Sequence, residues 1–238
     1  MSLSDNIATV SERIARAARE VGRDPAEITL VAATKVQTSL TIREAIAAGI
    51  TICGENRVQE LTAHLDDGAY EGAKIHFIGQ LQTNKVKYVV GRVDLIESVD
   101  SPRLLVAVDK QAGKLGIVQD ILLEVNIAGE ESKGGCPVEE LGALVLQAQQ
   151  APNVRLRGLM CIPPAALHFD NNCRFFAKAR QLYVDIRMKI GDNNVDTVDQ
   201  LSMGMSGDYE DAVREGATLV RVGTALFGPR PPMGAGKN

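Results

Sequence analysis

The stretch Thr29-Leu-Val-Ala-Ala-Thr-Lys35 is an apolar run that ends at a primary amine. A run of this length that stops at polar residues is typical of a buried strand in a parallel sheet, here with Lys35 at its carboxyl end. Lysine is rarely buried without a partner, so this amine either reaches solvent along its stem or has a chemical role. A desolvated lysine loses its proton readily, and the neutral amine can attack a carbonyl carbon to form a Schiff base. The strand alone leaves both readings open.

The rest of the chain repeats the unit of a strand followed by a helix. A first amphipathic helix, with Ile7, Val10 and Ile14 on one face and Gly22 at its end, is expected to cover the bottom of the fold. Later helices are predicted near residue 57, near 101 and from Pro137 onward. Strands are predicted over residues 29–35, 50–53, 74–78, 93–96, 121–125, 154–160, 200–203 and 218–222.

Eight such units in 238 residues predict an α/β fold, a single (β/α)₈ TIM barrel with an extra N-terminal helix. A doubly wound open sheet is the alternative. No linker-like segment divides the chain, so one domain is predicted over residues 1–230, with a flexible tail over 231–238.

Composition narrows the class of partner and the compartment. The net charge of -4 gives no basic surplus, which disfavours nucleic acid. There is no apolar run of membrane-spanning length and no signal-peptide pattern at the start, so we expect a cytoplasmic protein. The four cysteines lack zinc-site or paired spacing and are predicted to be reduced thiols, with no metal site.

The carboxyl ends of barrel strands share one face, where sites are built. The last two strands end in Ser202-Met203-Gly204-Met205-Ser206-Gly207-Asp208 and in Arg221-Val222-Gly223-Thr224-Ala225. Glycines expose backbone N–H groups, hydroxyls add donors, and a helix start adds positive dipole, so both segments favour an anion site. A helix cap and a turn glycine are the alternative. A phosphate site facing Lys35 suggests a phosphorylated aldehyde, and pyridoxal 5′-phosphate is the obvious candidate.

Three further residues have open roles. Arg221 lies two residues before Gly223, so it can face the barrel interior and hydrogen-bond the cofactor's ring nitrogen, or form an ion pair with an acid such as Glu55. Asn56, at the second strand end, can support the lysine or a cofactor oxygen, or can cap a turn. His76 lies near the start of its strand and is expected in the core rather than as a catalytic base.

The chain resembles the pyridoxal phosphate homeostasis proteins, also called the proline synthetase co-transcribed family. The resemblance is carried in order by Thr34-Lys35, Gly54-Glu55-Asn56-Arg57-Val58-Gln59-Glu60, the segment from His76 to Lys85, Glu131-Ser132-Lys133, Ser202-Met203-Gly204-Met205-Ser206, and the segment from Arg221 to Gly228. It implies a barrel like the N-terminal domain of alanine racemase, with the cofactor on Lys35, its ring nitrogen near Arg221 and its phosphate around Ser206, Gly223 and Thr224. We include Asn56, Ser202 and Met203 in the expected cofactor site.

The resemblance also implies a role in holding and distributing the cofactor without an established reaction. We therefore expect a monomeric carrier that takes part in pyridoxal phosphate homeostasis, with apo-enzymes that use this cofactor as recipients. The alternatives are a racemase or lyase that uses the cofactor, or a barrel enzyme that binds a sugar phosphate. Racemisation needs acid/base groups on both faces of the α-carbon, and the sequence offers only Lys35. Lys133 is a second amine that could accept the aldehyde from Lys35.

Overall fold

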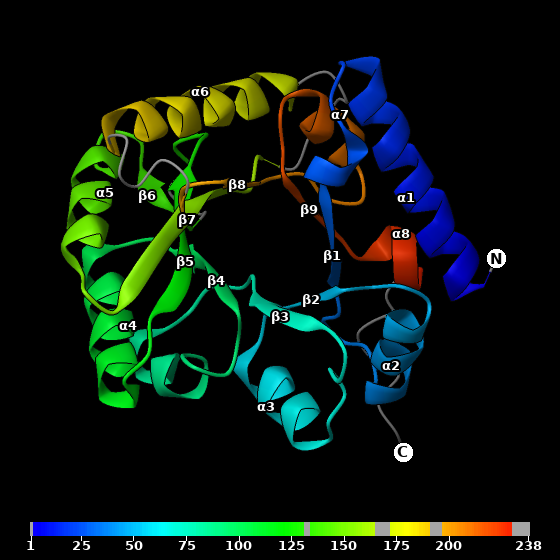
Figure 1. Cartoon of the computed structure of the whole chain (residues 1–238), viewed down its shortest axis with the longest axis horizontal. Coiled ribbons are helices and arrows are strands. Elements are labelled where there is room, and N and C mark those ends of the chain that lie inside the picture. Colours follow the sequence, from blue (N-terminus) through cyan, green and yellow to red (C-terminus); the bar gives the residue numbers. More distant parts are fainter. Residues whose placement is uncertain (1, 131–133, 165–171, 191–196, 230–238) are drawn as a thin grey trace.

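Eight parallel strands close into a barrel in the computed structural model, which describes residues 2–130, 134–164, 172–190 and 197–229. Each strand pairs with its neighbours in the order β4, β3, β2, β1, β9, β8, β7, β5, and a β4–β5 pairing closes the ring seen in Figure 1. A ninth, two-residue strand, β6, pairs with β5. The bounds are β1 Thr29–Ala33, β2 Ile52–Glu55, β3 Lys74–Phe77, β4 Leu95–Val99, β5 Gln119–Asn126, β6 Cys136–Pro137, β7 Val154–Cys161, β8 Gln200–Ser202 and β9 Leu219–Val222.

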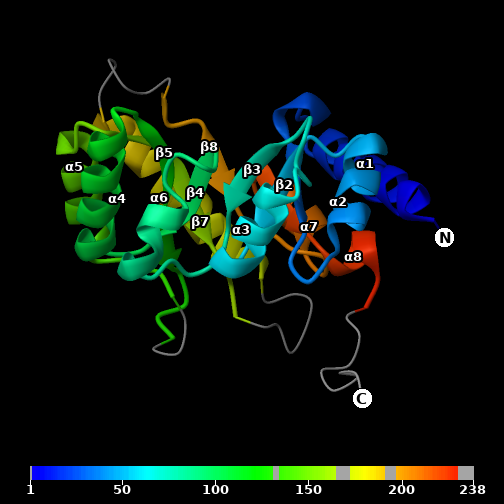
Figure 2. The ribbon, with the colours of Figure 1, turned by 90° about the horizontal axis from the view of Figure 1, so that it is seen from below.

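Helices surround the barrel on its outer side, and α4 and α5 lie at the end of the molecule opposite α1 (Figure 2). The α-helices are α1 Leu3–Glu20, α2 Ser39–Ala47, α3 Val58–Asp66, α4 Pro102–Leu115, α5 Leu141–Gln150, α6 Cys173–Ile190, α7 Tyr209–Arg214 and α8 Thr224–Phe227. The described residues also form two 3₁₀ helices, η1 Pro25–Glu27 and η2 Thr83–Tyr88. The predicted single barrel with an additional N-terminal helix is confirmed.

The N-terminal helix lies elsewhere than expected. It does not cover the bottom of the barrel but packs against α7 and α8 (Figure 1). Arg13 and Arg16 pair with Glu210 of α7, and Asn6 donates to the backbone oxygen of Leu226 at 2.8 Å. The helix thus buries its apolar face against the two elements that follow the last two carboxyl strand ends.

One predicted helix start is wrong. Pro137 was expected in the first turn of a helix, but it ends β6, and α5 begins at Leu141. Cys136 aligns with Val125 and Pro137 with Asn126 at the edge of β5. Proline has no N–H to donate, so the end of a short edge strand accommodates it.

The core has two layers. A large cluster fills the space between the strands and the helices, and a small apolar cluster fills the barrel itself: Val31, Ile52, Leu95, Leu122, Met160 and Leu219. Side chains alternate along a strand, so the residues two positions later share the interior. Three of these are Glu97, Glu124 and Arg221, all buried. The barrel interior therefore changes from apolar to charged toward the carboxyl ends of the strands.

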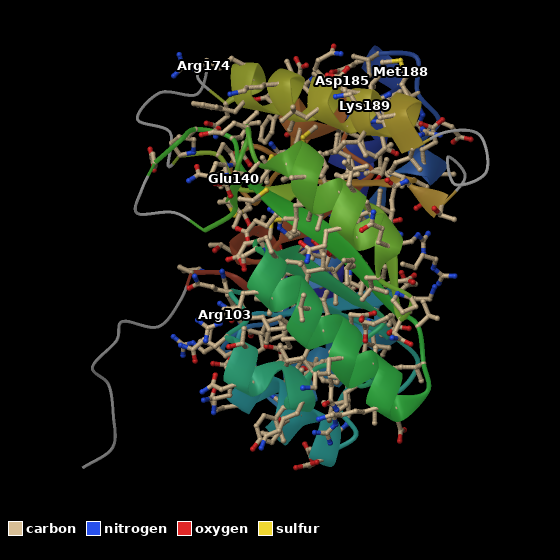
Figure 3. The ribbon with its side chains drawn as sticks, turned by 90° about the vertical axis from the view of Figure 1, so that its left-hand side faces the viewer. Arg103, Glu140, Arg174, Asp185, Met188 and Lys189 are labelled. Carbon is tan, nitrogen blue, oxygen red and sulfur yellow. The ribbon has the colours of Figure 1, made fainter. Side chains whose placement is uncertain are left out.

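The outer face of α6 is a solvated surface. Asp185, Met188 and Lys189 stand on it in Figure 3, and Met188 is 68% exposed. Within the described ranges, no helix combines the length and apolar character needed to cross a membrane.

Candidate functional site

A cavity of about 440 Å³ opens at the carboxyl ends of the barrel strands. Six of the eight residues predicted for the site line it: Lys35, Asn56, Ser206, Arg221, Gly223 and Thr224. These residues lie far apart in the sequence. They meet at one cavity because β1 pairs with β2 on one side and with β9 on the other. The volume suits a small cofactor or substrate.

Lys35 sits in a tight turn directly after β1. The Thr34 backbone N–H donates to the Gly54 carbonyl at 3.0 Å, and the Thr34 hydroxyl donates to Glu55 Oε1 at 2.7 Å. Val36 has a φ of 61°, which is rare for a β-branched residue, and its N–H donates to Glu60 Oε2 at 2.8 Å. Hydrogen bonds on both sides of Lys35 therefore fix the backbone that carries the amine.

The opposite wall is built by the segments after β8 and β9. Ser206 Oγ accepts the backbone N–H groups of Gly223 at 3.1 Å and Ala225 at 3.2 Å. The Ser206 hydroxyl hydrogen and the Thr224 hydroxyl remain as side-chain donors at the cavity wall. The two N–H groups thus hold Ser206 in place, and the arrangement offers the hydroxyl groups of Ser206 and Thr224 as donors to an anion.

Asn56 and Gly79 form one side of the cavity. Asn56 Oδ1 is buried and has no hydrogen-bond partner among the described residues. A Cβ at Gly79 would come within 2.1 Å of the Asn56 backbone oxygen, so only glycine lets the two strand ends approach this closely. A buried acceptor without a partner is costly, and a ligand that donates a hydrogen bond here would remove that cost.

Arg221 enters the cavity from below, and it forms the interior ion pair that was its alternative role, with Glu97 in place of the suggested Glu55. The guanidinium lies 3.8 Å from Glu97 Oε2, not against Glu55, and it donates to Ser202 Oγ and to the Cys161 carbonyl. Glu55 instead lies in a separate buried cluster with Tyr70 and His64, where burial raises its pKa.

The structure places the other two predicted site residues away from the cavity wall. Ser202 is fully buried beneath it and contacts Arg221, and Met203 packs into the outer core. Gly204, with a φ of 90°, turns the chain so that Met205 and Ser206 reach the cavity. Lys133, the second candidate amine, lies outside the described residues.

Glu124 is a cavity residue that the sequence analysis missed. Its side chain is 6% exposed and lines the cavity, where burial raises its pKa to about 7, against the opposing effect of the Arg221 charge. The expectation that Lys35 is the one acid/base group at this face was wrong. Alternation along β5 could have found Glu124, which lies two residues after the interior Leu122.

His76 does not reach the cavity. It is 4% exposed, contacts Glu97 through Nδ1 at 2.7 Å, and borders a second cavity of about 500 Å³ at the amino ends of the strands. This agrees with its expected place in the core.

Known proteins are similar to this chain along almost its whole length. Residues 6–231 match the family model described as alanine racemase, N-terminal domain. A pyridoxal phosphate homeostasis protein of Aquifex aeolicus (strain VF5) is 42% identical over 230 residues, covering 97% of this chain and 99% of that protein. The chain belongs to the pyridoxal phosphate homeostasis protein family.

Solved structures agree with this family assignment. PipY of Synechococcus elongatus PCC7942, solved with PLP bound, is 34% identical, with a TM-score of 0.82 and coverage of 95% of this chain and 100% of PipY. Alanine racemase of Streptomyces coelicolor A3(2) shares the fold at 19% identity and a TM-score of 0.71, and the chain covers 58% of that enzyme. The predicted resemblance, in family and in fold, is confirmed.

Proposed function

We propose that this protein binds pyridoxal 5′-phosphate in the 440 Å³ cavity and serves in the homeostasis of that cofactor. The observation that carries the proposal is one cavity with the Lys35 amine at one wall and the hydroxyl groups of Ser206 and Thr224 at the other. The names of the relatives and the PLP bound to PipY support it.

The residues present fit the chemistry of this cofactor. The Lys35 amine would condense with the cofactor aldehyde, releasing water, and hold it as a Schiff base. Ser206, Gly223 and Thr224 would hold the phosphate, and Arg221 would donate to the ring nitrogen. The unpaired Asn56 Oδ1 is available for a ligand hydroxyl. When bound, the cofactor supplies an electron sink next to its aldehyde carbon.

Covalent attachment at Lys35 is tested by borohydride reduction of the loaded protein followed by peptide mapping. The label is expected on Lys35, and Lys35→Ala should lose the yellow colour. Lys85 is the matched control, since it lies on η2 and does not line the cavity. A label found mainly on another lysine, or colour that survives Lys35→Ala, would end this assignment.

Phosphate recognition is tested by comparing pyridoxal 5′-phosphate with pyridoxal. Hydrogen bonds to a charged group contribute about 1.5 to 3 kcal/mol each, so Thr224→Ala should weaken retention of the phosphorylated form by roughly tenfold or more. Pyridoxal should bind poorly to both proteins. Equal affinity of the wild-type protein for the two forms would refute the phosphate site.

We infer a carrier rather than an efficient enzyme, acting in the cytoplasm as a monomer and donating to apo-enzymes that need the cofactor. Transfer from the loaded protein to a panel of apo-enzymes tests this role. Slow transfer, no faster than free cofactor supplies it, would contradict it.

A second candidate, an enzyme that moves the α-proton of an amino acid, is favoured by Glu124. It places a second acid/base group in the cavity with Lys35. Deuterium exchange at the α-carbon of common amino acids discriminates the two functions. Exchange at about 1 s⁻¹ or faster, abolished by Lys35→Ala and by Glu124→Gln, would show that the protein is an enzyme and would refute the proposed carrier function.

A further inference from the structure

A chain of buried polar contacts leads from the floor of the cavity into the barrel. Arg221 contacts the hydroxyl of Ser202, the same hydroxyl contacts Glu97 Oε2 at 2.5 Å, and Glu97 Oε1 contacts His76 Nδ1 at 2.7 Å. All four side chains are nearly inaccessible to solvent. They come from four different strands, β9, β8, β4 and β3, so closure of the barrel is what brings them together.

The donors and acceptors of these four side chains allow only one direction for each hydrogen bond between them. Arg221 has only donors, so Ser202 Oγ accepts from it and must give its own hydrogen to Glu97. Glu97 then accepts from Ser202 and from the Nδ1–H of His76. Burial alone would raise the pKa of Glu97, but the hydrogen bonds and the charge of Arg221 hold it below its ordinary value. The pair is therefore a carboxylate and a guanidinium bridged by a hydroxyl.

The bridge has a geometric consequence for the cavity. Glu97 and Arg221 are 3.8 Å apart at their nearest charged atoms, with Ser202 between them. A direct pair would draw the guanidinium toward Glu97, deeper into the barrel. The Cys161 carbonyl, which accepts from Nη2 at 3.0 Å, holds the other side of the same group. Both terminal nitrogens are thus anchored in the protein, and the guanidinium is held where Arg221 lines the cavity.

We propose that Ser202 and Glu97 are positioning residues that hold the Arg221 guanidinium at the ring nitrogen of the bound cofactor, and so determine how strongly that nitrogen is recognised. This inference rests on the proposed function, since it needs a pyridine ring in the cavity. Ser202 thereby has a role in the site without touching the ligand. His76 acts one step further back, by orienting the carboxylate.

The test uses two ligands that differ at one atom: pyridoxal 5′-phosphate and its carbocyclic analogue, in which C–H replaces the ring nitrogen. Both carry the same aldehyde and phosphate, so loss of folding or of the other contacts weakens both equally. The wild-type protein should prefer the nitrogen-containing ligand by about tenfold, the value of one hydrogen bond to a charged group. The dissociation constants of both ligands are measured for each variant by titration of the absorbance.

Ser202→Ala should reduce that preference to about twofold or less, because Arg221 then pairs directly with Glu97. Ser98→Ala is the matched control, since Ser98 is a buried serine next to Glu97 whose hydroxyl has no partner in the part of the chain that the structure describes, and it should leave the preference unchanged. Glu97→Gln, which keeps the shape and removes the charge, should also reduce the preference.

Three results would overturn the inference. They are an unchanged preference in Ser202→Ala, an equal loss in Ser98→Ala, and a wild-type protein that binds both ligands equally well. The third leaves the proposed function intact, because the cofactor still binds. A wild-type protein that binds neither phosphorylated ligand overturns the proposed function itself, and the inference with it.

Discussion

The residue that matters most at the site, Lys35, is followed by a residue in a costly backbone conformation. Val36 adopts a φ of 61°, and a β-branched side chain in that region costs about 1 to 3 kcal/mol. The hydrogen bond from its N–H to Glu60 holds the turn in place. The Val36 side chain is 49% exposed, so its burial offsets little of this strain energy. The turn that places Lys35 at the cavity therefore holds Val36 in this strained conformation.

Val36→Gly should stabilise the ligand-free protein by about 1 kcal/mol, because glycine adopts this φ without a steric penalty and loses only some chain entropy. Urea denaturation at equilibrium measures the change. Val36→Ala is the matched control, since it shortens the side chain but stays an L-residue with Cβ, and it should gain much less. A glycine variant less stable than the alanine variant would show that Val36 is not strained.

At the scale of elements, the ends of β2 and β3 must approach closely to form the cavity wall. The loops after them carry Asn56 and Gly79, and no side chain fits between the two. The unpaired Asn56 oxygen is placed by this contact. The position of the Asn56 side chain is therefore fixed by the close backbone contact at the ends of β2 and β3, and not by a side-chain interaction.

Gly79→Ala should destabilise the protein by about 1 to 3 kcal/mol and weaken retention of the cofactor, because the added methyl would displace the Asn56 backbone. Gly207→Ala is the control for stability, since Gly207 also lines the cavity but an added Cβ meets nothing within 4 Å. Thermal unfolding of the ligand-free proteins compares them. Equal unfolding temperatures would mean that the wall tolerates a side chain at Gly79.

The elements were largely predictable from sequence, and the misses have physical causes. The run from Thr29 to Lys35 and the alternation of strands and helices predicted the barrel, because each buried parallel strand reads as an apolar segment. The site was predicted from strand ends, which succeeded for Lys35 and Ser206. The prediction of Met203 failed because side chains alternate at the end of β8: Leu201 and Met203 pack into the outer core, while Ser202 faces the barrel interior and contacts Arg221. The prediction took every residue of the segment after the strand as part of the site and did not apply this alternation.

At the scale of the whole molecule, the barrel interior holds a small set of charges that must balance. Arg221 and Glu97 compensate each other through Ser202, and the Glu124 carboxyl faces the same space. Counting by twos from Leu122 would have found Glu124, and from Leu95 would have found Glu97, once the closed ring was known. Which charges meet across the barrel depends on strand order, so the ring had to be seen first.

The carboxyl of Glu124 makes stability depend on pH. Its pKa is raised by burial from 4.5 in an exposed carboxyl to about 7 in the folded protein. An acid with a raised pKa contributes stability that is present below about pH 4.5 and is lost as the pH rises through about 7. Glu97, whose pKa is lowered, acts in the opposite sense and loses its contribution as the pH falls.

Glu124→Gln should therefore gain up to about 3 kcal/mol relative to the wild-type protein between roughly pH 4.5 and pH 8, since one pKa unit corresponds to about 1.4 kcal/mol. The amide keeps the shape of the side chain and cannot ionise, so the variant differs from the wild type only in lacking the Glu124 titration. The pH-dependent contribution of Glu97 to stability is the same in both proteins. Urea denaturation of the ligand-free proteins across that range measures the difference. Glu139→Gln, at an exposed position, is the control and should track the wild type at every pH. A stability difference between Glu124→Gln and wild type that stays constant with pH would mean that Glu124 is already ionised in the folded protein below neutrality.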